Sequence, residues 1–143
     1  MGLRSIANVS HHHNFAWKET LSDGREVMVH RKGATPAHAG EAGIIPGSMT
    51  AAGYLVCGKG QPEALYSASH GAGRAMSWQK ARDSFTRSDL NRMLASAGVT
   101  LIGGSIEEAS PAYRNIDRVM EAQTALVDVH GRFMPRIVRM NKE

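Results

Sequence analysis

The sequence predicts an α+β fold: a mixed sheet with packed helices, forming one domain over residues 1–143. Short apolar runs typical of strands and stretches with helical spacing both occur, but they do not alternate strictly along the chain. No internal repeat and no change in composition marks a domain boundary, and 143 residues are enough to bury a single core. We therefore expect a single α+β domain.

The strand predictions rest on alternation and on turn residues. Val27 and Val29 alternate with polar residues, which is typical of a half-buried strand. Short strands are expected at residues 25–32, 54–57, 64–67, 99–102 and 136–140. Residues 33–53 are rich in Gly and Ala and are expected to form a long loop, a type of segment that is often functional.

Two helices are expected in the second half of the chain. A helical pattern begins at residue 77, and Ser88 is expected to cap a helix that ends near Gly98. Ser110, followed by a proline, is a good helix start. Apolar residues then recur at three-to-four spacing as far as Val127, so we expect this second helix to reach that residue.

Composition limits the class of protein. The chain is 42% apolar and 21% charged, which excludes a disordered segment. Its net charge of +4 favours polyanionic partners such as RNA or nucleotide phosphates, although solubility alone can account for such a charge. With the single cysteine Cys57, no intrachain disulfide can form, and no apolar stretch approaches the roughly 20 residues of a membrane span. We expect a cytoplasmic protein that does not contact membranes.

Three consecutive histidines, His11 to His13, precede Asn14 near the chain start. Imidazole is a good ligand for Mn²⁺ and related metals. Adjacent residues of an extended segment point to opposite sides, so at most one or two of the three could reach the same ion. A tag remnant or a solvated polar run is the alternative. The other histidines show no paired ligand spacing, and a metal site would therefore be incomplete within this chain.

A second motif, SASHGAGR at residues 67–74, places His70 between small residues. Small residues let backbone N–H groups approach an anion, and Arg74 adds a planar fork that matches phosphate oxygens. In such a setting His70 could act as acid, base or nucleophile toward phosphorus. The alternative is a glycine-bounded turn around a hydrogen-bonded histidine.

A third motif, GIIPGSM at residues 43–49, contains the Pro46-Gly47 pair typical of a tight turn, with the Ser48 hydroxyl at its apex. It could be an ordinary connection between strands. Together with the basic run that contains Arg31 and Lys32, it could instead form the second wall of a phosphate site. Arg31, Lys32 and Arg74 are thus weaker candidates for contacts with RNA or phosphate.

The strings HHNFAWKE, VHRKGATPA, AGIIPGSM, SASHGAGRAMS and PAYRNIDRVM, in this order and spacing, resemble the RtcB family of RNA-splicing ligases. The resemblance runs from about Asn8 to the end of the chain. It implies the C-terminal portion of an RtcB-like fold. It also implies an enzyme that uses GTP and Mn²⁺ to join RNA ends with a 2′,3′-cyclic phosphate or 3′-phosphate to 5′-hydroxyl ends. In that family a histidine forms a covalent His-GMP, and the resemblance assigns this role to His70.

The resemblance also implies the other site residues. His13 would be a Mn²⁺ ligand. The guanylate would be surrounded by Asn14, Pro46, Gly47, Ser48, Gly71, Ala72, Gly73, Tyr113 and Lys142. The family's other metal ligands, an Asp, a Cys and two His, lie upstream of the HHN string, and Cys57 does not correspond to that Cys. We therefore expect residues 1–143 to represent a ligase without its upstream metal-ligand half, with little or no activity alone.

Two other functions stay open. The chain could be a non-catalytic guanine-nucleotide- or RNA-binding module, or a subunit that completes its site with a separate N-terminal partner chain. The resemblance implies two ligands, GTP and RNA, the latter as tRNA or other cleaved RNA ends. Archease, an activator of some family members, is a further possible partner.

Overall fold

The computed structural model describes residues 9–140 and has an α+β fold, as the sequence predicts. Within this part of the chain the strands form four small sheets instead of a single mixed sheet. The elements in chain order are β1 (Asn14–Thr20), β2 (Glu26–Lys32), β3 (Ala34–Pro36), β4 (Ala42–Ile45), β5 (Gly53–Gly58), β6 (Ser67–Ser69), α1 (Trp78–Ser84), α2 (Arg87–Ala97), β7 (Thr100–Ile102), α3 (Ile116–Glu121), β8 (Val127–Phe133) and β9 (Ile137–Arg139). Short 3₁₀ turns occupy Pro62–Ala64, Ile106–Glu108 and Ser110–Ala112.

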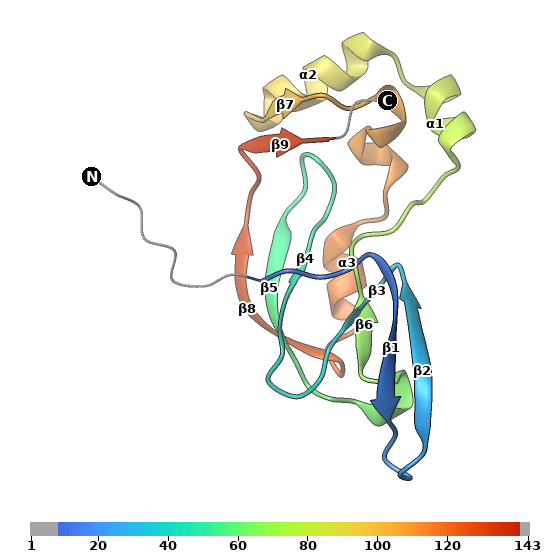
Figure 1. Cartoon of the computed structure of the whole chain (residues 1–143). Coiled ribbons are helices and arrows are strands. Elements are labelled where there is room, and N and C mark those ends of the chain that lie inside the picture. The colour runs from blue at the N-terminus through green and yellow to red at the C-terminus, as the bar shows by residue number, and fades with distance from the viewer. Residues whose placement is uncertain (1–8, 141–143) are drawn as a thin grey trace.

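The elements are arranged along one axis (Figure 1). The antiparallel hairpin of β1 and β2 projects at one end, and α2 with the parallel pair β7 and β9 lies at the other. Between them β4, β5 and β8 form a three-stranded antiparallel sheet, while β3 pairs with β6. The short strand β6 leads directly to His70, so the β3–β6 pair positions that residue.

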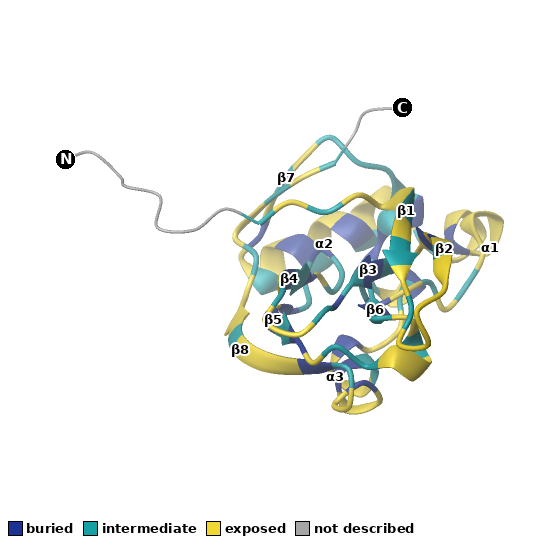
Figure 2. Cartoon of the chain, turned by 60° about the horizontal axis from the view of Figure 1, so that its bottom comes forward, coloured by how far each residue is buried: buried dark blue, intermediate teal, exposed yellow. Residues whose placement is uncertain are grey.

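Two clusters of buried apolar side chains form the core, one on the central sheet and one beneath α2. The first contains Ala37, Ile45, Ala52, Tyr54, Val56, Ala68, Ala72, Ile116, Met120 and Val127. The second contains Met49, Leu90, Leu94, Val99 and Ala109. Figure 2 shows α2 with alternating buried and exposed bands, typical of a helix that packs on one side. Each large apolar side chain buried in this way contributes about 1.5–3 kcal/mol to folding.

Helix α2 is bounded by a cap at each end. Its N-terminal cap is Thr86 and not Ser88 as expected: the Thr86 hydroxyl accepts from the Asp89 amide, and the Asp89 carboxylate accepts from the Thr86 amide at 2.9 Å. The Thr86 hydroxyl also donates to the Asp89 carboxylate at 2.7 Å, and this hydrogen bond, together with the one from the Thr86 amide, holds the pKa of Asp89 below its usual range. Gly98 ends the helix with φ 64°, a left-handed conformation that glycine adopts at little cost.

Other element predictions need correction. Residues 33–53 are not one loop, because they contain β3, which pairs with the distant β6, and β4, which pairs with the next strand, β5. The strand expected at 64–67 begins instead at Ser67. The helix expected from Ser110 to Val127 is a 3₁₀ turn followed by the short helix α3, which Asn115 caps by accepting from the Asp117 amide at 2.8 Å.

The strand β8, which the sequence analysis did not predict, begins at Val127 and pairs with β5. Within residues 9–140, the helices are all too short or too polar to cross a membrane.

Candidate functional site

His70 lies at the end of β6, where hydrogen bonds fix the backbone on both sides. The His70 amide donates to the Gly33 carbonyl oxygen at 3.1 Å, which extends the β3–β6 pairing by one residue. The preceding Ser69 amide donates to Gln123 Oε1 at 2.9 Å, and the Ser69 hydroxyl donates to the Gly71 carbonyl at 2.7 Å. Because Gln123 is buried, the position of the His70 backbone depends on the same core as α3.

The segment after His70 packs against the turn at residues 46–48. The Ala72 amide donates to the Pro46 carbonyl at 3.1 Å. A Cβ at Gly71 would lie 3.1 Å from that same carbonyl oxygen, so the close approach favours glycine. Gly73 has φ 68°, which also favours glycine. The glycines of the HGAG string are therefore explained by backbone packing as well as by the space they leave beside His70.

The His13 ring lies against the His70 ring, with centroids 4.7 Å apart and planes at 82°. Burial lowers the pKa of His70, and the nearby His13 and His11 lower it further. At neutral pH the His70 imidazole is therefore unprotonated, as a nucleophile or base must be. His11 is placed by a hydrogen bond of its Nε2 to the Ala42 carbonyl, at 3.2 Å.

A pocket of about 560 Å³ surrounds this histidine pair. It is lined by His13, Gly33, Pro46, Gly47, Ser69, His70, Gly71, Ala72, Gly73, Arg74, Trp78, Tyr113, Arg114 and Val119. Nine residues singled out in the sequence thus meet at one cavity. Ser48 lines a smaller, adjoining pocket of about 270 Å³ that shares Pro46, Gly47 and Tyr113.

Arg74 is held inside this pocket wall. Its Nε donates to the Met76 carbonyl at 3.1 Å, and one terminal nitrogen donates to the Glu107 carbonyl at 3.0 Å. The guanidinium lies between the Trp78 ring, at 4.0 Å, and the Tyr113 ring, at 5.3 Å. Its other terminal nitrogen, Nη1, is buried and has no hydrogen-bond partner among the residues that the structure describes.

Tyr113 donates a hydrogen bond from its hydroxyl to Glu108. Burial raises the pKa of Tyr113 to about 12, and the Glu108 carboxylate adds to the effect. The phenol therefore stays protonated and acts as a donor. A backbone bridge between Arg74 and Tyr113, with the Arg114 amide donating to the Gly73 carbonyl at 2.9 Å, joins this residue to the His70 segment.

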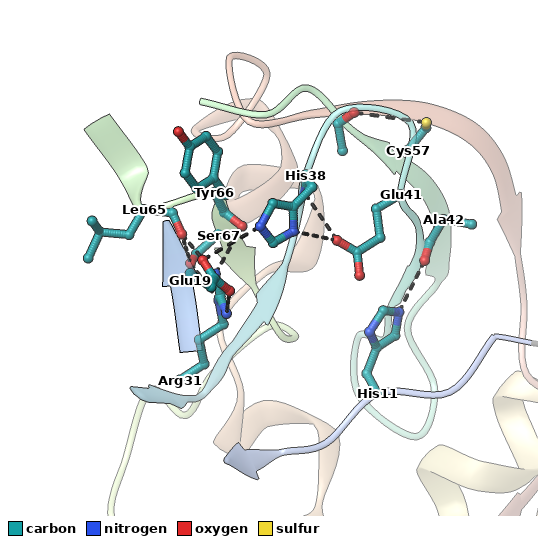
Figure 3. Close-up of polar contacts among 11 residues, drawn as sticks. His11, Glu19, Arg31, His38, Glu41, Ala42, Cys57, Leu65, Tyr66 and Ser67 are labelled. Carbon is teal, nitrogen blue, oxygen red and sulfur yellow. Dashed lines mark hydrogen bonds and ion pairs between the residues drawn. The ribbon is translucent and has the colours of Figure 1, made fainter. Parts of the chain in front are cut away.

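Arg31 differs from the role expected for it. Its guanidinium is only 1% exposed and forms an ion pair with Glu19 on β1; it also donates to Ser67 Oγ at 2.8 Å and to the Leu65 carbonyl at 2.9 Å (Figure 3). All of these partners are protein groups. Arg31 therefore ties the hairpin to β6, and this geometry gives no support to a phosphate contact there.

Two other predicted residues lie apart from the pocket wall. Asn14 is exposed on β1, and its Oδ1 accepts from His30 Nε2 at 2.7 Å. Lys32 is opposite Asn14 in the hairpin register and is also exposed. Lys142 is outside the described residues.

Sequence reasoning missed Trp78, Gly33 and Arg114 among the residues of the pocket. Gly33 could have been found, because it follows the basic strand directly in the RKGA string. Trp78 is the one aromatic residue of α1, and none of the motifs found in the sequence includes it.

The donor set does not fit a complete metal centre. In residues 9–140, no three His, Cys, Asp or Glu side chains are grouped so that they could hold a metal ion. His13 and His70 provide two imidazoles, whereas a protein site for a divalent cation of this kind normally needs more protein ligands. Any metal at this place would require ligands from outside the described residues.

Comparisons with known proteins agree with the motifs. The chain is 45% identical over 125 residues to the RNA-splicing ligase RtcB1 of Escherichia coli, an alignment that covers 87% of this chain and 30% of that protein. It is 38% identical over 131 residues to the tRNA-splicing ligase RtcB of Methanococcus maripaludis, covering 76% and 27%. For the Nanoarchaeum equitans protein of the same name the identity is 34% over 161 residues, covering 94% and 33%.

The chain thus spans about a third or less of the length of these curated relatives. The family model described as tRNA-splicing ligase RtcB matches residues 2–141, almost the whole chain. The protein therefore belongs to the RtcB family of tRNA-splicing ligases.

Proposed function

We propose that this chain is the guanylate-binding part of an RtcB-type RNA ligase, with an RtcB-like fold, in which His70 carries GMP. One observation supports this most directly: the His70 ring lines a 560 Å³ pocket beside His13, and burial lowers its pKa. Relatives named RNA-splicing ligases supply the class of substrate. The complete enzyme would join RNA 3′-phosphate or 2′,3′-cyclic phosphate ends to 5′-hydroxyl ends.

The proposed chemistry begins with attack of the unprotonated His70 nitrogen on the α-phosphorus of GTP. A nitrogen–phosphorus bond forms as the bond to the β-phosphate oxygen breaks, and pyrophosphate leaves. An RNA 3′-phosphate oxygen then attacks the guanylyl phosphorus and releases His70. Attack of the 5′-hydroxyl oxygen on the RNA phosphorus finally forms the phosphodiester and releases GMP.

The residues around His70 would bind and orient the guanylate. Pro46, Gly47 and Tyr113 line both adjoining pockets, and Ser48 lines the smaller one, so a nucleotide that spans the two pockets would contact all four. The smaller pocket is mostly apolar, which suits a purine ring, while the larger contains Arg74 and the histidines, which suit phosphates. Asn14 and Lys142 remain proposed nucleotide contacts.

The complete enzyme would use Mn²⁺, with His13 as one ligand from this chain. The other ligands would come from an upstream portion of the protein or from a partner chain, because the described residues do not form a full set. We therefore expect this chain alone to bind metal weakly and to join little or no RNA.

The test is transfer of labelled GMP from GTP. We expect little labelling of the chain alone with Mn²⁺, and strong labelling when the remaining part of the E. coli relative is added as a separate polypeptide. His70→Asn should abolish the labelling, whereas His130→Asn, an exposed histidine on β8, should leave it intact. Strong labelling of the chain alone would contradict the expected inactivity, and labelling of His70→Asn would contradict the assignment of the nucleophile.

The lack of a metal-binding group in residues 9–140 also favours a second candidate, a non-catalytic guanine-nucleotide- or RNA-binding module. Guanosine binding that is unaffected by Mn²⁺ and by His70→Ala would support it. Co-purification of a chain that carries Asp, Cys and His ligands would instead support a split ligase. An archease-like activator would be detected as a protein that increases labelling without itself being labelled.

A further inference from the structure

Trp78 is a large aromatic residue that is 51% exposed on the wall of the His70 pocket. It is the first residue of α1, which Ser77 caps by accepting from the Lys80 amide at 3.2 Å. An exposed tryptophan at a pocket wall leaves apolar surface in contact with water, which is unfavourable. A flat ligand that covers the ring removes this unfavourable contact and is thereby bound more tightly.

One face of the Trp78 ring is already covered by Arg74, whose guanidinium carbon lies 4.0 Å from the ring centroid. Arg74 in turn is fixed by the carbonyls of Met76 and Glu107 and lies over Tyr113. The indole therefore lies on a fixed support, and the ring presents its exposed surface at a defined place. Such an arrangement is a preformed platform, since little side-chain freedom remains to be lost on binding.

We propose that Trp78 stacks against a nucleobase of the RNA strand whose phosphorylated end lies at His70. This inference rests on the proposed function and adds a residue that recognises unpaired RNA. Base–aromatic stacking tolerates any base, because every base has a π-face, and it requires that the base be unstacked from its neighbours. Trp78 would therefore favour single-stranded ends without selecting a sequence.

A base of the RNA suits Trp78 better than the guanine of GTP does. The turn at Pro46 and Gly47 leads into the smaller apolar pocket, which Trp78 does not line. If the guanine occupies this smaller pocket, the Trp78 ring stays free to stack on a base of the RNA. The platform and the guanine pocket thus share the His70 phosphate site but take different bases.

The two tryptophans of the chain provide the test and its matched control. In Trp17→Phe the intrinsic fluorescence comes from Trp78, and in Trp78→Phe it comes from Trp17, which packs on Arg31 in the hairpin. We would titrate each with a single-stranded RNA trinucleotide that carries a 3′-phosphate, and separately with GMP. The RNA should quench Trp78 saturably and leave Trp17 unchanged. Quenching of Trp78 by GMP but not by RNA, or no quenching by RNA up to millimolar concentration, overturns the proposal.

Affinity provides a second measurement that does not depend on fluorescence of the protein. With dye-labelled RNA in anisotropy, Trp78→Leu should weaken binding by roughly five- to a hundredfold, the range for loss of one stacked base, whereas Trp78→Phe should retain most of it. Leu55→Ala, which removes a comparably exposed side chain from β5, should have no effect. Equal affinities of Trp78→Leu and the unchanged chain would overturn the proposal.

Failure of this inference can be distinguished from failure of the proposed function. Labelled GMP on His70 together with an unresponsive Trp78 would refute the platform alone. Quenching of Trp78 by RNA without any transfer of GMP to His70 would refute the ligase chemistry and leave the platform intact.

Discussion

The imidazole of His13 meets that of His70 edge to face, at a centroid distance of 4.7 Å. His13 directly precedes β1 and His70 directly follows β6, and their contact brings together the first and second sequence motifs. A proton on His70 is disfavoured by positive charge on His13, because like charges at this distance repel each other. The effect of His13 on the pKa of His70 can therefore be measured.

The first prediction concerns the protonation of His70. Its pKa should lie below the ordinary value of 6.5, with burial as the larger cause and His13 as the next. In His13→Ala the pKa of His70 should rise but stay below 6.5, because the burial remains. Imidazole NMR titration of both proteins would measure these values. An unchanged His70 pKa in His13→Ala would show that the two rings do not interact as the structure indicates.

The same shift predicts a pH dependence of stability. Because the pKa of His70 is lowered in the folded chain, the unfolded chain takes up that proton first as pH falls. The contribution of neutral His70 is fully present above pH 6.5 and is lost as pH falls through the folded-state pKa. Urea unfolding across this window should show a smaller decline for His70→Asn than for the unchanged chain. Parallel declines would contradict the prediction.

The ion pair of Arg31 and Glu19 should dominate the stability of the hairpin. The two side chains are 1% and 10% exposed, so Arg31→Met leaves a buried carboxylate without its main partner. We expect a loss of about 3–5 kcal/mol in the free energy of unfolding, measured by urea denaturation. Arg31→Met combined with Glu19→Gln should lose less than the sum of the two single changes.

The matched control for this pair is Asp23→Ala, which breaks the exposed pair with Arg25. It should cost less than about 1 kcal/mol, because exposed ion pairs are screened by water and salt. Equal effects of Arg31→Met and Asp23→Ala would show that the Arg31 guanidinium is not buried in solution.

Gly47 should not tolerate a larger residue. A Cβ at this position would collide with the Ala52 carbonyl oxygen and lie 3.0 Å from the Ala51 Cβ, and neither atom can move unless the backbone that carries it also moves. Gly47→Ala should therefore cost about 1–3 kcal/mol in thermal or urea unfolding, the range of overpacking. Gly131→Ala is the control, because its Cβ would meet only the flexible end of Leu55, at 3.3 Å. A stable Gly47→Ala would contradict the packing of this turn.

Glu107 should contribute to stability in an acid-sensitive way. Hydrogen bonds from the Ser105 side chain, its own backbone amide and Arg82 hold the pKa of Glu107 down to about 2. Its contribution is present above the unfolded pKa of about 4.5 and is lost as pH falls toward 2. Glu107→Gln should thus be less stable than the unchanged chain at neutral pH, with the difference shrinking between pH 4.5 and 2 in urea denaturation. A difference in free energy of unfolding that stays constant over this pH range would contradict the prediction. Glu63→Gln, which removes a glutamate from an exposed turn, is the control.

The sequence motifs indicated which residues lie together more directly than they indicated which strands pair. His13, Pro46, Gly47 and His70 come from three separate motifs, and the structure places all of them at one pocket. Such motifs are recognisable because glycines at fixed spacing indicate close backbone packing and the histidines between them indicate a chemical role. Strand pairing is harder to predict from sequence: β3 and β4 are only three and four residues long, and each is defined by its pairing with β6 or β5.

Arg31 shows that local composition does not predict burial. The basic run around it resembles a phosphate site, but Arg31 shares its side of β2 with Val27 and Val29, which face inward. Strand parity predicts burial at this position, while charge predicts exposure. The carboxylate that resolves the conflict, Glu19, lies on a strand that the sequence analysis did not predict.

The turn at residues 46–48 joins the two hydrophobic clusters, since Ile45 belongs to the one on the central sheet and Met49 to the one beneath α2. A ligand that binds to this turn therefore contacts the segment that connects the two clusters, and its binding should couple their unfolding. In calorimetry, the thermal unfolding transition should therefore be sharper when a ligand is bound to the turn than when the turn is free.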